Sequence, residues 1–66
     1  MSEEYKRFIR QFKAVAISKG MSVQEVADVI GVNMVTVYSW WRFNTVMDGD
    51  RMLRVVKKIM GGLLSC

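Results

Sequence analysis

The sequence predicts an all-α protein, a compact bundle of four to five short helices in a single domain. Four segments repeat apolar residues at steps of three and four, which is the period of an amphipathic helix. The 66 residues include no proline, and five glycines lie between these segments or at their ends. One segment is rich in β-branched residues, but no second strand-like segment exists to pair with it, so a sheet is not expected.

Composition supports one folded domain, residues 1–66. A chain of this length needs an efficient core, and 52% of its residues are apolar, which is too many for a disordered tail. No run approaches the ~18 apolar residues of a membrane span, and the acidic start at 1–4 has no apolar block after it, so no signal peptide is expected. A single cysteine, Cys66, cannot form an internal disulfide, which fits a cytoplasmic protein.

The first predicted helix covers residues 2–19. Ser2 is expected to cap it, and the two glutamates that follow lie where the helix dipole favours negative charge. Lys19 and Gly20 form a C-terminal signal, a cation followed by a residue that tolerates the left-handed conformation. Its apolar stripe consists of Tyr5, Phe8, Ile9, Phe12, Val15 and Ala16.

Two short helices are predicted next, over 23–30 and 34–42. The first begins with a capping box in which Ser22 and Glu25 bind each other's backbone N–H groups. The second has Asn33 as its expected cap. The inward residues are expected to be Val23, Val26, Ala27 and Ile30 in the first helix, and Val37 and Trp40 in the second.

The last predicted helix covers residues 49–60, with Asp48 as its cap, and a short apolar tail follows over 61–66. Its apolar stripe is Met52, Leu53, Val56, Ile59 and Met60. Two groups of cations are expected mainly to face solvent: Lys6, Arg10 and Lys13 in the first helix, and Arg51, Arg54, Lys57 and Lys58 in the last.

Residues 22–42 combine two short helices with a three-residue connection, which is typical of a helix-turn-helix. Ala27 is small where the second helix would cross the first. Gly31 accepts a positive φ angle without strain, and Val32 supplies the apolar residue that turns inward after it. The spacing therefore predicts a helix-turn-helix over this segment.

This segment resembles the helix-turn-helix of the phage repressor and Cro family, the lambda-repressor-like domains. The resemblance lies in Val26, Ala27, Asp28, Ile30, Gly31, Val32, Val37 and Trp40. A weaker resemblance extends to Leu53 and Ile59, which stand like apolar positions of the family's later helices. The chain departs from the family after Arg42, where a glycine or asparagine loop and a proline are common and this chain has Phe-Asn-Thr-Val-Met at 43–47.

The resemblance implies binding of double-stranded DNA, with the second helix of the motif in the major groove. Four outward residues are expected nearest the base edges: Asn33, Met34, Val35 and Ser39. The two polar side chains can form hydrogen bonds with bases, and the two apolar ones can pack against thymine methyl groups.

Other outward residues are expected at phosphates, where they set register without reading sequence. They are Ser22 and Gln24, with the free N–H groups of the helix that they begin, together with Thr36, Tyr38 and Arg42. Trp41 has two alternatives, packing on the last helix or lying half exposed beside the DNA backbone.

One such domain contacts few base pairs, so a homodimer on a palindromic operator is expected, at least on DNA. The candidate dimer surface is the C-terminal end, with Ile59, Leu63 and Leu64, and the alternative is that this tail folds back on its own core. The net charge of +4 also favours a polyanionic partner, nucleic acid before an acidic membrane surface.

The sequence offers no histidine, no nucleophile paired with a base, and no cluster of metal ligands, so no enzyme, metal, cofactor or small-molecule substrate is expected. The expected function is that of a phage Cro-like or repressor-like transcriptional regulator in a bacterial host cytoplasm. Two alternatives stay open. One keeps the fold, as an excisionase-like architectural factor or an antitoxin, and the other is a helical protein-interaction module.

Overall fold

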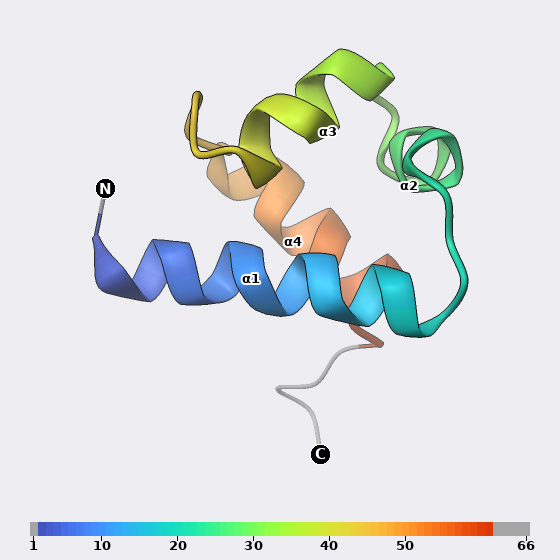
Figure 1. The fold of residues 1–66 in the computed structure, drawn as a ribbon, viewed down its shortest axis with the longest axis horizontal. Coiled ribbons are helices and arrows are strands. Elements are labelled where there is room, and N and C mark those ends of the chain that lie inside the picture. The colour runs from blue at the N-terminus through green and yellow to red at the C-terminus, as the bar shows by residue number, and fades with distance from the viewer. Residues whose placement is uncertain (1, 62–66) are drawn as a thin grey trace.

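Four helices follow one another in a computed structural model that describes residues 2–61. They are α1 (Glu3–Ser18), α2 (Val23–Ile30), α3 (Met34–Trp41) and α4 (Gly49–Lys58). No strand occurs within the described range, so the all-α prediction is confirmed, and each helix boundary lies within two residues of its predicted place. Figure 1 shows α1 along one side of the molecule, with α3 above it, α4 behind and α2 seen end-on.

The predicted caps form at three of the four helices. Ser2 accepts a hydrogen bond from the Tyr5 N–H, the capping box at the start of α2 is complete, and Asn33 caps α3. Each side chain satisfies a backbone donor that has no partner within its helix.

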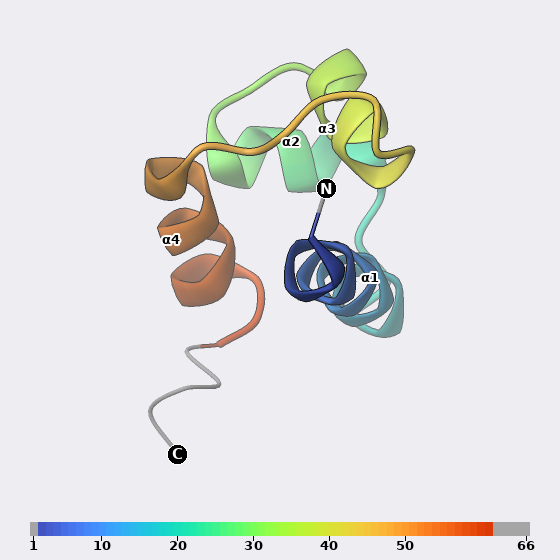
Figure 2. The same cartoon turned by 90° about the vertical axis from the view of Figure 1, so that its left-hand side faces the viewer.

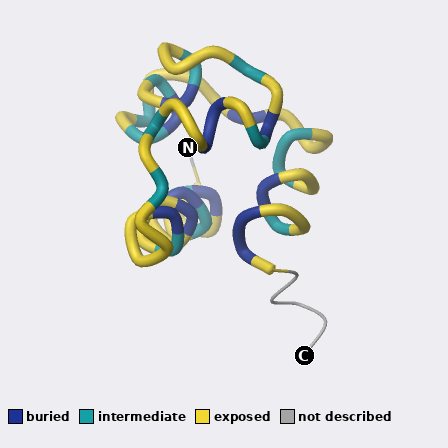
Figure 3. The backbone as a smooth tube through the Cα atoms, turned by 90° about the vertical axis from the view of Figure 1, so that its right-hand side faces the viewer, coloured by how far each residue is buried: buried dark blue, intermediate teal, exposed yellow. Residues whose placement is uncertain are grey.

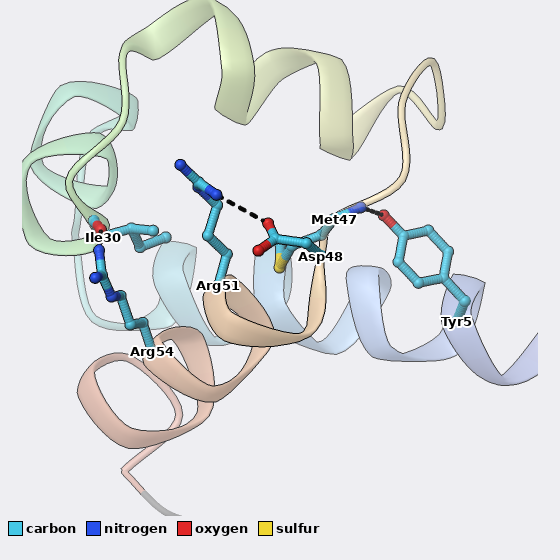
Figure 4. Close-up of polar contacts among 6 residues, drawn as sticks. All are labelled: Tyr5, Ile30, Met47, Asp48, Arg51 and Arg54. Atoms are coloured by element: carbon cyan, nitrogen blue, oxygen red, sulfur yellow. Dashed lines mark hydrogen bonds and ion pairs between the residues drawn. The ribbon is translucent and has the colours of Figure 1, made fainter.

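At α4 the predicted residue, Asp48, takes the cap position, but its side chain does not cap the helix. Asp48 has the extended backbone of a cap residue, but its carboxylate makes no capping hydrogen bond. It accepts instead from the Arg51 guanidinium at 3.0 Å, one turn along α4 (Figure 4). That hydrogen bond lowers the pKa of the Asp48 carboxyl below its ordinary value. The charged guanidinium of Arg51 therefore donates to the Asp48 carboxylate in place of a backbone N–H.

One hydrophobic core joins all four helices, and Figure 3 shows the buried stretches of the chain facing inward. Contacts run between α2 and α3, α2 and α4, and α1 and α3. The Lys19 ammonium also donates to the Ile59 carbonyl oxygen, which joins the end of α1 to the end of α4. The core consists of Tyr5, Ile9, Phe12, Ala16, Val26, Ala27, Ile30, Val37, Trp40, Met47, Val55, Ile59 and Met60.

The predicted stripe of α4 needs one correction. Leu53 was expected inside, but its side chain is 57% exposed, whereas Val55 has no exposed surface. Residues two apart on a helix point about 200° apart, so only one of this pair can face the core. The structure buries Val55 one turn before Ile59. Leu53, which the weaker family resemblance likens to an apolar position of the family's later helices, therefore does not pack in the core.

A hydrogen-bonded bridge from α1 fixes the segment between α3 and α4, whose path the sequence did not predict. The Tyr5 hydroxyl accepts from the Met47 N–H at 2.9 Å and donates to the Thr45 carbonyl oxygen at 3.4 Å. Met47 is buried beside it, and Figure 4 shows the tyrosine reaching this segment from α1. We call this contact the Tyr5 bridge.

Tyr5→Phe is expected to lower the free energy of unfolding by about 1 to 3 kcal/mol, because the buried Met47 N–H loses its acceptor. Urea unfolding followed by circular dichroism measures the change. Tyr38→Phe is the matched control, since the Tyr38 side chain is 41% exposed and its hydroxyl has no hydrogen-bond partner among the described residues. Equal stability of the two variants would contradict a structural role for the Tyr5 bridge.

Candidate nucleic-acid interface

The connection between α2 and α3 is closed by backbone hydrogen bonds at its first two residues. Gly31 is left-handed, with φ 89°, and ends α2. Its N–H and that of Val32 both donate to the Ala27 carbonyl oxygen, at 2.8 and 3.0 Å. Val32 is half-buried against the core, as predicted. This turn leads the chain directly into the Asn33 cap of α3.

A side chain from α4 also binds this turn. The Arg54 guanidinium donates to the Ile30 carbonyl oxygen at 3.0 Å, and Figure 4 shows the arginine reaching it from α4. A cation at the C-terminal end of a helix is favoured by the helix dipole as well as by the hydrogen bond. Arg54 is exposed, as expected, but it also ties α4 to the end of α2.

Gly31→Ala is expected to destabilise the protein by about 1 kcal/mol or more, because a side chain in the left-handed region is strained. A Cβ there would also lie 3.4 Å from Arg54 Nη1. Gly49→Ala is the control. Its Cβ meets open space in the first turn of α4, so stability should rise by about 0.5 kcal/mol. Thermal unfolding of both variants distinguishes them, and a neutral Gly31→Ala would contradict the role of the turn.

The side of α3 opposite the core is largely apolar. Val37 and Trp40 are buried, as predicted, and hold the helix against the core. Val35 is 74% exposed on the other side, Met34 is 40% exposed, and Tyr38 is similarly exposed. Val35, the most exposed of these large hydrophobic side chains, has no packing role within the described chain.

The two polar residues predicted at base edges already have partners. Asn33 Oδ1 accepts from the Thr36 N–H at 2.9 Å and from the Thr36 hydroxyl at 3.1 Å, so its amide NH₂ is the group left to donate. Ser39 is half-buried, and its hydroxyl oxygen accepts from the Thr45 hydroxyl at 3.1 Å. Ser39 thereby links α3 to the segment held by the Tyr5 bridge.

The side chains predicted at phosphates differ in whether other groups of the chain already bind them. The Ser22 N–H and hydroxyl are both bound to Glu25 in the capping box, while Gln24 is exposed. Thr36 is half-buried, and its hydroxyl donates to the Asn33 side chain that caps α3. The exposed Arg42 guanidinium lies 5.7 Å from the centre of the Tyr38 ring, within the range of a cation–π contact.

Trp41 is half-buried, and its ring contacts α1, a helix that neither predicted alternative named. Its ring meets Phe12 edge to face, with centroids 5.6 Å apart, and Lys13 Nζ lies 5.8 Å from its centre. The indole N–H is buried without a partner among the described residues. No local pattern in the sequence identifies Phe12 and Lys13 as the partners of Trp41, because both lie far from it along the chain.

Of the predicted dimer residues, Ile59 has no exposed surface and belongs to the core of the single chain. Leu63 and Leu64 lie outside the described residues, as does Cys66.

Comparison with family models, curated proteins and solved structures finds no match to this chain. Within residues 2–61, no helix is long and apolar enough to cross a membrane. The same part of the chain contains no group of three or more histidine, cysteine, aspartate or glutamate side chains placed to hold a metal ion.

Asn33→Ala is expected to cost about 1 kcal/mol of stability, because the Thr36 N–H loses its cap. Asn33→Ser keeps a capping hydroxyl and should stay within a few tenths of a kcal/mol of the parent protein. Chemical unfolding tests both. If the serine variant were as unstable as the alanine variant, the stabilising contact would be something other than the cap.

Proposed function

We propose that this chain is a small transcriptional regulator that binds double-stranded DNA through a helix-turn-helix formed by α2 and α3. The observation that carries the proposal is the exposed face of α3. The helix follows a fixed left-handed turn, is anchored by Val37 and Trp40, and leaves Val35 74% exposed at its start. An anchored helix with a free opposite face is what a recognition helix requires.

The dimensions of α3 support this role. With its side chains an α-helix is about 10–12 Å across, which fits a major groove ~12 Å wide, and the eight residues of α3 extend about 12 Å along it. Figure 2 shows α3 beside the start of α2, on the side of the molecule away from α4. DNA lying on this side would meet both helices of the pair.

Readout in this proposal is mainly apolar. Met34 and Val35 pack on thymine methyl groups, and the free amide NH₂ of Asn33 donates to a base acceptor. Ser39 contributes less than the sequence predicts, because its hydroxyl already binds Thr45. Much of the specificity then comes from methyl contacts and DNA shape.

The assembly we propose is a homodimer on a palindromic operator, as in the phage repressor and Cro family, in a bacterial cytoplasm. Half-sites would then lie ~34 Å apart. An excisionase-like architectural factor or an antitoxin would use the same α3 surface, but an architectural factor would protect repeated sites and bend the DNA.

A helical protein-interaction module is the second candidate. The exposed apolar side chains Met34, Val35 and Tyr38 favour it, because such a patch also suits a protein partner. This module would retard no DNA at low salt, which separates it from the main proposal.

Selection from random duplexes tests the function, with thymines expected at the positions facing Met34 and Val35. Val35→Ala should weaken binding to the selected site about tenfold, because two methyl groups are worth about 1.5 kcal/mol of burial. Anisotropy titration against the selected and a scrambled duplex measures both affinity and preference.

Leu53→Ala is the matched control, an exposed aliphatic residue on α4 with 57% of its surface free. It should leave affinity unchanged. Selection of half-sites without thymine, or equal loss in the two variants, would contradict the assigned reading face.

A further inference from the structure

The proposed DNA-binding pair of helices carries little positive charge. Residues 20–42 contain one cation, Arg42, and two carboxylates, Glu25 and Asp28, so their net charge is −1 although the whole chain carries +4. Contacts with phosphates supply a large share of DNA affinity. The cations that neutralise those phosphates must therefore come mainly from outside this segment.

Two basic helices are available, and α4 is the less suitable one. Arg51 is bound to Asp48, and Arg54 is bound to the Ile30 carbonyl oxygen. The other two cations, Lys57 and Lys58, lie in the last turn of α4. Figure 2 shows α4 on the opposite side of the molecule from α3.

The basic face of α1 lies next to α3. Arg10 and Lys13 are exposed and three residues apart, so their side chains share one face of the helix. Lys13 Nζ lies 5.8 Å from the centre of the Trp41 ring, which places this face beside the C-terminal end of α3. Arg42 is the next residue after Trp41, with its guanidinium over the Tyr38 ring.

We propose that Arg10, Lys13 and Arg42 form a basic strip that binds the DNA backbone along the flank of α3. The inference rests on the proposed function and assigns most of its electrostatic affinity to a helix outside the α2–α3 pair. Trp41 is a positioning residue in this arrangement, because its ring holds the Lys13 ammonium beside α3. The strip recognises phosphate and so acts on any duplex sequence.

The test compares two double variants that each remove two positive charges. Arg10→Gln with Lys13→Gln should lower the steepness of log K against log salt by about 1.8, or 0.9 for each lost phosphate contact. Affinity near 0.1 M salt should fall on the order of 5- to 10-fold for each charge. Lys57→Gln with Lys58→Gln should leave the slope unchanged. Anisotropy titrations on selected and scrambled duplexes measure both, and thermal unfolding checks that the variants fold.

The possible outcomes distinguish failure of the basic strip from failure of the proposed DNA binding. Equal loss in both double variants would overturn the strip, because only the overall charge would matter. An unchanged slope in the α1 variant, with binding still weakened about tenfold by Val35→Ala, would overturn the strip and leave the proposed DNA binding intact. Absence of binding by the parent protein at low salt would overturn both.

Discussion

The left-handed turn at Gly31 sets the relation between α2 and α3, and the other contacts around it depend on that relation. It lets the Ala27 carbonyl oxygen accept two N–H groups and brings Asn33 into the extended conformation of a cap. It also leaves the Ile30 carbonyl oxygen for Arg54, so α4 is fixed to the same point. Three helices thus meet at one turn, and this turn determines which face of α3 points away from the core.

Much of the fold was predictable, because its signals are local in sequence. Ser2, the capping box at Ser22 and Asn33 each mark a helix start by contacts within three residues. The inward placing of Val37 and Trp40 follows from the helical period alone. The exposure of Met34 and Val35 follows in turn, because the opposite side of α3 is already occupied.

What sequence reasoning missed depends on pairs distant along the chain or on competition between partners. Asp48 had two available donors, and the Arg51 guanidinium displaced the backbone N–H. Trp41 meets Phe12, 29 residues earlier, and no local pattern identifies that partner. The choice of Val55 over Leu53 depends on how α4 is rotated about its axis, which only the packed neighbours decide.

The Tyr5 bridge has a consequence for the order of folding. Tyr5 and Met47 are 42 positions apart, so α1 leaves the ribosome long before the segment that it contacts. Closing so long a loop costs chain entropy that local helix formation does not repay. The α2–α3 hairpin can form from contacts close in sequence, whereas the path from α3 to α4 is completed only when nearly the whole chain has been synthesised. We therefore expect the contacts between α1 and the segment after α3 to form later in folding than the α2–α3 hairpin.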